Sequence, residues 1–209
     1  MLDGDGLEKV LGETVSRETV DMLETHLALL EKWNPAINLV SSGSLKDGWS
    51  RHTIDSAQVF VPGRNRAGLW VDFGSGGGFP GLVAAILATE LAPDLRFVLV
   101  ESDKRKSAFL LNAVNTLKLN VTILAERVEA LPCQSAQVIS ARAVSELGQL
   151  LNYAEPHLAE DGICIFPKGE RYEQEISRAE KHWRFKLAQR QSITDPKAVI
   201  LVLGDIQRV

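Results

Sequence analysis

The residues of this chain that are best placed to do chemistry lie in and beside one glycine-rich stretch. An apolar run that suits a buried parallel strand ends at Asp72, and a glycine cluster over residues 74–78 separates it from the amphipathic residues 82–91. Glycine allows a tight turn with positive φ, and it lets a ligand approach the backbone where no Cβ intervenes. The pattern therefore predicts a strand, a turn and a helix start around a ligand-binding crevice.

An acidic residue at the end of the next apolar run supports this prediction. A glycine cluster alone also fits a tight turn that only packs a helix. Residues 96–100, however, form a second apolar run that ends at Glu101. In dinucleotide-type folds an acidic residue near this spacing accepts hydrogen bonds from ribose hydroxyls. The two features together indicate a cofactor that contains a nucleoside.

The glycines fit two types of cofactor. Gly76-x-Gly78-x-x-Gly81 matches the fingerprint that places a pyrophosphate at a helix N-terminus, which predicts an NAD(P)-dependent oxidoreductase. Asp72-x-Gly74-x-Gly76-x-Gly78 resembles motif I of the S-adenosylmethionine methyltransferases, whose loop wraps the amino-acid part of the cofactor. The Asp72 carboxylate favours the second type, because it suits a cationic amino group and sits poorly beside a pyrophosphate.

Composition limits the class of protein. The chain has 209 residues, 45% of them hydrophobic and 24% charged, which suits one well-cored domain with an extension. The formal net charge of -4 argues against binding nucleic acid through bulk charge, but it allows a local basic patch. Cys133 and Cys164 have no metal-ligand spacing, and no signal peptide or membrane-spanning run occurs. We therefore expect a cytoplasmic protein with no metal and no membrane partner.

The elements that must position these residues alternate along the chain. Apolar runs predict strands at residues 69–72, 96–100, 121–124, 136–141 and 162–166. Amphipathic stretches predict helices at residues 82–91, 103–118 and 172–182, and a closing hairpin is predicted from residues 185–192 and 198–203. This α/β layout is expected of the Rossmann-like class I S-adenosylmethionine methyltransferase sheet, which is mostly parallel with an antiparallel last strand.

A helical extension precedes the predicted sheet. The first dozen residues are polar and contain glycine, so we expect this segment to be frayed at its start. Apolar spacing predicts a helix from about Arg17, with Ser16 as its N-cap and Asn34-Pro35 as its end. A polar turn and a second helical segment follow.

The boundary of the core is predicted at residues 62–66, whose proline, glycine and polar residues are typical of a linker. We therefore expect residues 1–65 to form a helical extension packed on the core. Residues 66–209 are then the methyltransferase domain.

Two polar clusters outside the glycine stretch are ambiguous. In Arg51-His52-x-x-Asp55-Ser56, His52 and Asp55 share one helix face. They form either a catalytic or RNA-contacting group or a polar hinge between elements, and we prefer the hinge. Residues 104–106, Lys-Arg-Lys, lie at a helix start where cations gain nothing from the helix dipole, so they are a candidate phosphate contact or a solvated first turn.

Several motifs together are similar to those of the glucose-inhibited-division protein B family. They are Trp33-Asn34 with Asn38-Leu39, Arg51-His52-x-x-Asp55-Ser56, the glycine stretch through Phe79-Pro80-Gly81, Arg127-Val128-Glu129 and Ser140-Ala141-Arg142-Ala143. Members of that family are S-adenosylmethionine-dependent 16S ribosomal RNA methyltransferases that act on the N(7) position of a guanine. The family often has serine directly before the arginine, and this chain departs from that pattern while keeping Arg142 in place.

The resemblance implies which residues form the site. It places cofactor contacts on Gly74, Phe79, Glu101, Val128, Glu129 and Arg142, and the glycine pattern adds Asp72 and Gly76. Arg127 and Arg142 are the implied catalytic residues, although the spacing alone also allows each to be a salt-bridged structural group. Lys168, after the fifth predicted strand, is a weaker candidate for a substrate contact. No metal ligand is implied.

The implied reaction needs positioning rather than a base. Guanine N(7) carries a lone pair and no proton, so it attacks the methyl group of S-adenosylmethionine in line. The expected partner is 16S rRNA in the small ribosomal subunit or its assembly intermediate, and a monomer is favoured while the oligomeric state stays open. The competing interpretations are the NAD(P)-dependent oxidoreductase and a non-enzymatic ribosome-associated factor that retains a cofactor fold.

Overall fold

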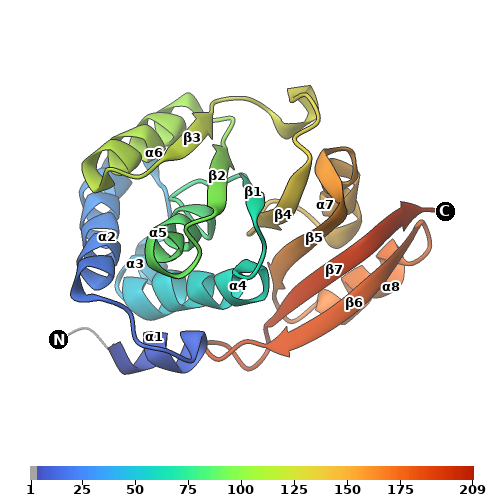
Figure 1. Ribbon diagram of the computed structural model, residues 1–209, viewed down its shortest axis with the longest axis horizontal. Coiled ribbons are helices and arrows are strands. Elements are labelled where there is room, and N and C mark those ends of the chain that lie inside the picture. Colours follow the sequence, from blue (N-terminus) through green and yellow to red (C-terminus); the bar gives the residue numbers. More distant parts are fainter. Residues whose placement is uncertain (1–3) are drawn as a thin grey trace.

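A seven-stranded sheet forms the centre of the computed structural model, which describes residues 4–209 (Figure 1). The strands are β1 Gly68–Phe73, β2 Leu95–Val100, β3 Val121–Leu124, β4 Ala136–Ala141, β5 Leu158–Lys168, β6 Trp183–Gln191 and β7 Val199–Arg208. Their order is β3-β2-β1-β4-β5-β7-β6; β1 to β5 pair in parallel, and β7 runs antiparallel to β5 and β6. The structure confirms the predicted Rossmann-like sheet with its closing hairpin.

The strand order reverses between β1 and β4. From β1 the chain moves outward to β2 and β3, and it then returns to pair β4 on the other side of β1. In open α/β sheets, ligands bind outside the carboxyl ends of the strands at such a reversal. The glycine loop after β1 and Arg142 after β4 both lie at this position.

Helices cover both faces of the sheet (Figure 1). The α-helices are α1 Gly4–Leu11, α2 Arg17–Ile37, α3 Ser42–Leu45, α4 Asp55–Gly63, α5 Gly81–Leu91, α6 Lys104–Leu117, α7 Leu147–Ala154 and α8 Tyr172–Ala179. A π-helix, η1 Trp49–Ile54, leads into α4, and the short 3-10 turns are η2 Val128–Ala130 and η3 Glu155–His157. None of the helices described here is long and apolar enough to cross a bilayer.

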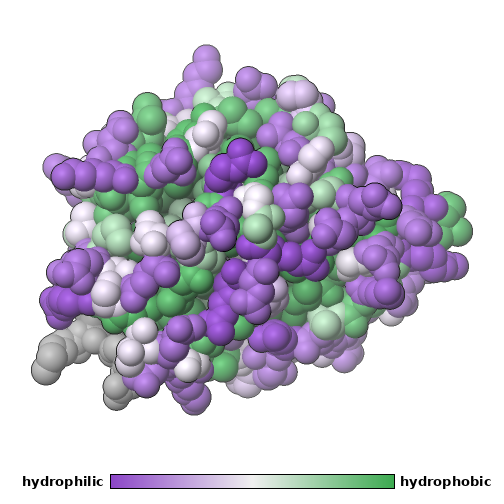
Figure 2. All heavy atoms as spheres, viewed as in Figure 1, coloured by the Kyte–Doolittle hydropathy of each residue, from purple (hydrophilic) through white to green (hydrophobic). Residues whose placement is uncertain are grey.

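Side chains alternate across β1, and this alternation divides the core in two. Trp70 packs with the cluster under α2, α4, α5 and α6, whereas Val71 and Phe73 belong to the cluster under α7 and α8. Asp72 points to the same face as Trp70, where its carboxyl group lies beside the start of α5. Polar side chains cover much of the outer surface, with hydrophobic atoms visible between them (Figure 2).

The N-terminal segment differs from its prediction at the end of one helix. The first residues, where a frayed start is expected, lie outside the described residues; α1, which was not predicted, begins at Gly4 and buries Leu7 and Leu11 in the core with 1% and 2% exposure. The predicted stop at Asn34-Pro35 is wrong, since α2 continues to Ile37. Proline removes one donor from the last turn, and the helix ends only where Asn38 adopts a left-handed conformation with φ of 49°. Ser16 caps the helix as predicted, accepting a hydrogen bond from the Thr19 N–H.

Several other element boundaries differ from their predicted positions. The predicted turn before the second helical segment contains the short helix α3, and α4 extends into the predicted linker as far as Gly63. The predicted helix over residues 172–182 ends at Ala179, and β5 begins earlier than predicted, at Leu158. No element was predicted for α7, although its buried leucines and Ala154 follow helical spacing over one short stretch.

Candidate active site

The glycine loop turns sharply between β1 and α5. Gly74, Gly76 and Gly78 all have positive φ, at 63°, 51° and 89°. Gly81 has an ordinary backbone but no room for a side chain, because a Cβ there would lie 2.4 Å from Leu99 Cδ2 and 2.6 Å from Asp72 Cβ. The glycines therefore serve both turn geometry and close packing of α5 on the sheet.

Glu101 ties the end of β2 to this loop. Its Oε2 accepts a hydrogen bond from the Gly76 backbone N–H at 2.9 Å, and its Oε1 accepts one from the Asp103 N–H at 2.8 Å. The side chain is buried, with 7% of the residue exposed. Each carboxylate oxygen has a further lone pair, so Glu101 can hold the loop and still accept hydrogen bonds from a ligand.

Asp72 lies beneath the loop with none of its surface exposed. Its Oδ1 accepts a 2.6 Å hydrogen bond from the Ser140 hydroxyl, which in turn accepts one from the Trp70 indole N–H at 2.8 Å. Its Oδ2 has no hydrogen-bond partner among the described residues. Burial raises the pKa of Asp72 to about 6, although Ser140 and other nearby groups act to lower it. A buried carboxylate with a free oxygen is suited to a cation.

A pocket of about 160 Å³ opens beside the loop at the carboxyl ends of β1 and β2. Four predicted site residues line it, namely Gly74, Arg127, Val128 and Glu129. Its volume is smaller than the roughly 300–1,000 Å³ typical of small-molecule sites. Val144 closes one side, because a Cβ on Gly74 would lie 2.6 Å from Val144 Cγ2.

Arg142 follows β4 and faces the other side of the loop. Its Nη1 donates to the Arg51 carbonyl at 3.2 Å, its Nη2 lies 3.0 Å from His52 Nδ1, and its guanidinium carbon is 5.0 Å from the centre of the Phe79 ring. No ion pair within 4.0 Å involves Arg142 in the described part of the chain. Burial lowers the pKa of Arg142, and the nearby charges of Asp55 and Asp72 partly oppose this.

Two histidines, one on α2 and one on η1, lie against the Phe79 ring. The ring centres of His26 and His52 lie 4.8 Å and 4.7 Å from that of Phe79. His26 is fully buried, and its Nε2 hydrogen-bonds to the Gly77 carbonyl at 2.8 Å. Burial lowers the pKa of each histidine to about 4, so both are neutral at pH 7. His26 was not among the predicted site residues. Its only mark in the sequence is that it is a polar residue on the apolar face of α2.

The residues of the Arg51-His52-x-x-Asp55-Ser56 motif have two different surroundings: Asp55 joins two elements of the fold, and His52 lies at the candidate site. Asp55 accepts hydrogen bonds from the Thr194 hydroxyl and from Gln58, and so joins α4 to the turn between β6 and β7. His52 instead faces Arg142 and Phe79. The hinge residue Asp55 and the site residue His52 are therefore three positions apart, on either side of the junction between η1 and α4.

Other predicted basic residues are engaged elsewhere. Lys168 is buried, pairs with Glu175 at 2.7 Å and donates to the Ser145 carbonyl at 2.7 Å. It therefore supports the loop after β4 from within. At the start of α6, Arg105 lies 3.6 Å from Asp103, whose carboxylate also caps the helix. The Arg127 side chain is exposed and makes no hydrogen bond or ion pair with the described residues.

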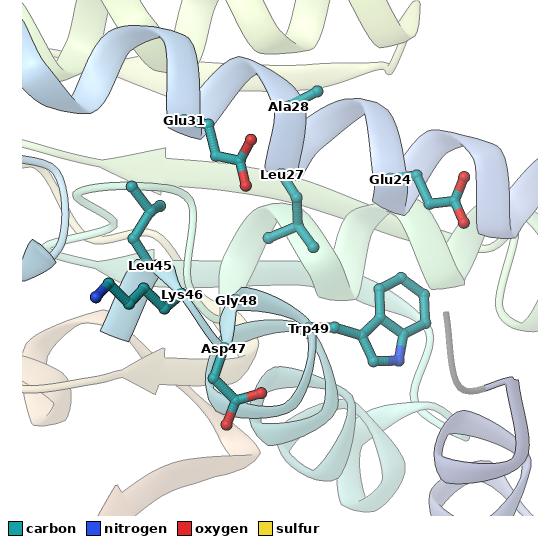
Figure 3. Close-up of a pocket in the computed structure, with 9 residues that line it drawn as sticks. All are labelled: Glu24, Leu27, Ala28, Glu31, Leu45, Lys46, Asp47, Gly48 and Trp49. Carbon is teal, nitrogen blue, oxygen red and sulfur yellow. The ribbon is translucent and has the colours of Figure 1, made fainter. Parts of the chain in front are cut away.

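A second hollow, of about 320 Å³, lies between α2 and the segment before η1 (Figure 3). Leu27 points into it, and Glu24, Glu31 and Asp47 stand around it. None of the predicted site residues lines this hollow. The described residues also contain no cluster of three or more His, Cys, Asp or Glu side chains that could hold a metal.

The family model and the curated relatives that match this chain carry the same family name. Residues 19–201 match the model of GidB, rRNA small subunit methyltransferase G. A Ruegeria sp. (strain TM1040) protein named Ribosomal RNA small subunit methyltransferase G is 48% identical over 195 residues, covering 93% of this chain and 95% of its own. A protein of the same name from Cereibacter sphaeroides (strain ATCC 17025 / ATH 2.4.3) is 52% identical, covering 93% and 94%.

Solved structures share the fold at low sequence identity. M. jannaschii TYW2 in complex with AdoMet has a TM-score of 0.55 at 16% identity, covering 81% of this chain and 78% of that one. Precorrin-6y C5,15-methyltransferase from Geobacter metallireducens GS-15 has a TM-score of 0.53 at 14% identity, covering 81% and 93%. These likenesses show that proteins with quite different sequences share this fold.

Proposed function

The chain belongs to the GidB family of rRNA small subunit methyltransferase G proteins, and we propose that it methylates N(7) of a guanine in 16S rRNA with S-adenosylmethionine as donor. One observation carries the proposal. The family match over residues 19–201 contains the whole arrangement of glycine loop, Glu101 and Arg142 at the strand-order reversal.

The residues at the loop fit S-adenosylmethionine, which supplies a methyl group on a cationic sulfonium. Glu101 retains lone pairs for the ribose hydroxyls. The unpartnered Oδ2 of Asp72 provides negative charge for the cationic amino-acid end. Val128 offers an apolar wall for the adenine, in the same pocket that Gly74 lines.

A dinucleotide fits the same loop less well. The Gly76 N–H, a donor that a pyrophosphate would need, is already bonded to the Glu101 carboxylate. Both Glu101 and Asp72 would repel phosphate oxygens at this position. The electrostatics therefore support the sulfonium cofactor over NAD(P).

The methyl acceptor needs orientation and no proton transfer. Two N–H groups of Arg142 are committed to Arg51 and His52, which fixes the plane of the guanidinium. The remaining N–H groups can donate to the acceptor edge of a guanine or to a neighbouring phosphate. Arg127, exposed beside the pocket, is suited to a second phosphate contact. Held geometry of this kind lowers the barrier by removing orientational freedom before reaction.

The experiment is methyl transfer from tritiated S-adenosylmethionine to small subunits from a strain that lacks this gene. We expect tritium in 16S rRNA, at a guanine where borohydride and aniline cleave the chain. Parallel reactions with naked 16S rRNA and precursor particles identify the preferred substrate. No incorporation into any of the three would support a non-enzymatic factor, and tight binding of NAD(P) without S-adenosylmethionine binding would support the oxidoreductase.

The finer assignments follow from this function. The partner is the small ribosomal subunit or its assembly intermediate, and the location is the cytoplasm, where that particle is found. We also propose the division at residue 65 as one between an extension and a methyltransferase domain. The extension is part of the site, because His26 and His52 both come from it.

A further inference from the structure

Arg142 is held by neutral acceptors rather than by a carboxylate. Its two hydrogen-bond partners are the Arg51 carbonyl and His52 Nδ1, and the face of its guanidinium lies over Phe79. A carboxylate partner would neutralise the cation and occupy two of its donors in a fork. Neutral acceptors fix the orientation of the guanidinium and leave its charge available to a ligand.

The hydrogen bonds around His52 assign its tautomer. Arg142 is always a donor, so Nδ1 of the imidazole must accept and the proton must be on Nε2. Nε2 lies 3.1 Å from the Ser44 hydroxyl, which donates to the Ser41 carbonyl at 2.9 Å. The donors therefore run in one direction, from Arg142 through His52 and Ser44 to the carbonyl of Ser41, the N-cap of α3. Each group in this series donates to an atom that can accept.

We propose that His52 is a positioning residue for methyl transfer, whose neutral imidazole accepts a hydrogen bond from Arg142 and aims its guanidinium at the methyl acceptor. The proposal rests on the function above, because it takes Arg142 as the group that contacts the RNA. It assigns to the Arg51-His52 motif a role in the reaction rather than only in joining elements.

The charges that face His52 favour this neutral state. Burial of His52 disfavours its cationic form most, and the positive charges of Arg142 at the end of β4 and Arg51 on η1 add to this effect. His26 on α2 contributes in the same direction only when it is itself protonated. Asp55 on α4 and Asp72 on β1 act on Arg142 instead. An imidazolium would offer two donors to a guanidinium that has no acceptor atom, so protonation would release Arg142.

A structural alternative is that His52 only packs against Phe79. Two substitutions separate these roles. His52→Phe keeps an aromatic ring on Phe79 and removes the acceptor, whereas His52→Asn shortens the ring contact and retains a side-chain oxygen that can accept from Arg142. A packing role predicts that phenylalanine is tolerated better than asparagine, and a positioning role predicts the reverse.

The test measures turnover on small subunits together with S-adenosylmethionine affinity by calorimetry. For His52→Phe we expect turnover to fall about 10- to 100-fold, the worth of one hydrogen bond to a charged group, with the cofactor Kd nearly unchanged. His52→Asn should recover much of the loss. In the double variant with Arg142→Ala, His52→Phe should cost nothing further. Full turnover in His52→Phe, or losses that add in the double variant, would overturn the proposal.

A second readout does not depend on methylation. Nitrogen-15 NMR of the labelled imidazole in the free protein should show the proton on Nε2 at pH 7, and Arg142→Ala should raise the pH at which His52 titrates. A proton on Nδ1, or a titration indifferent to Arg142→Ala, would refute the inference. If instead the wild type fails to methylate any substrate while these spectra hold, the proposed function fails and the Arg142–His52 contact stands.

Discussion

Glu101 accepts a hydrogen bond from the backbone N–H of Gly76, and this contact joins the carboxyl ends of two neighbouring strands at 2.9 Å. The acid at the end of β2 therefore shapes the loop after β1 before any ligand arrives. The proposed cofactor contact and the observed shape of the loop therefore depend on the same carboxylate.

Glu101→Gln should weaken S-adenosylmethionine binding by about tenfold or more, the worth of a lost charge-assisted acceptor. Glutamine presents one oxygen and one NH2 group, so it cannot accept from both Gly76 and Asp103. Calorimetric titration measures the change. Glu160→Gln, at an exposed site on β5, is the matched control and should leave the affinity unchanged. Equal affinity in both variants would remove Glu101 from the cofactor site.

Asp72→Asn should stabilise the free protein at pH 8 and weaken cofactor binding. Burial raises the pKa of Asp72 to about 6, so the folded state prefers the neutral acid and loses stability as pH rises through that value. The cost at pH 8 is about 3 kcal/mol at most, from the difference between the folded and ordinary pKa values. Urea unfolding at pH 8 and pH 4 should show a gain at pH 8 that disappears at pH 4.

Acid should destabilise the protein through His26. Burial lowers the pKa of His26 to about 4, so between the ordinary value of 6.5 and pH 4 the unfolded chain binds a proton that the folded chain does not. Stability present above pH 6.5 is thus lost as pH falls, by about 3 kcal/mol at most. His26→Phe, made in the Asp72→Asn background to remove the opposing titration, should reduce the loss of unfolding free energy between pH 6.5 and pH 4, and His52 accounts for a remaining part of that loss. An unchanged slope would contradict the assignment.

Gly81→Ala should destabilise the fold by about 1–3 kcal/mol or more, because its Cβ would overlap Leu99 and Asp72 on the sheet. Gly148→Ala is the matched control. No atom lies within 4 Å of a Cβ at that helical position, so alanine there should be neutral or stabilising by about 0.5–1 kcal/mol. Chemical denaturation gives the free energy of unfolding of each variant. The difference between them separates the steric cost of the new Cβ at residue 81 from the general effect of replacing glycine by alanine, and similar stabilities would refute the packing argument.

Lys168→Met should cost up to about 3–5 kcal/mol, because it leaves the partly buried Glu175 carboxylate without its cation and the Ser145 carbonyl without its donor. Adding Glu175→Gln should restore part of the loss, since the amide oxygen can still accept from the Leu147 N–H. A double-mutant cycle from urea unfolding gives the coupling. Additive losses would show that the pair does not act together.

The elements with strong local patterns were predictable from the sequence. Apolar runs located β1 to β4 closely, and the glycine cluster located the turn at the strand-order reversal. The stop at Asn34-Pro35 failed because one missing donor near a helix end is outweighed by packing of the whole helix. Helix α7 is short enough that its apolar spacing gives little signal.

Contacts between distant segments could not be predicted in the same way. His26 reaches Gly77 and Lys168 reaches Ser145 only after the sheet has formed, and neither residue differs in type from an ordinary surface histidine or lysine. The pairing of His52 with Arg142 likewise joins residues whose sequence separation is 90. Residue propensity and apolar spacing predict single helices and strands, whereas the contacts of these side chains depend on how the elements pack together.

The bond from His26 to the Gly77 carbonyl has a consequence for how the molecule is made. Helix α2 is synthesised before the turn after β1, so the imidazole lacks this acceptor until the turn has been made and has docked against it. A chain shortened to residues 66–209 would contain all seven strands but lack the ring that braces this turn. The contact that fixes the glycine turn therefore forms only when a segment made early meets one made later.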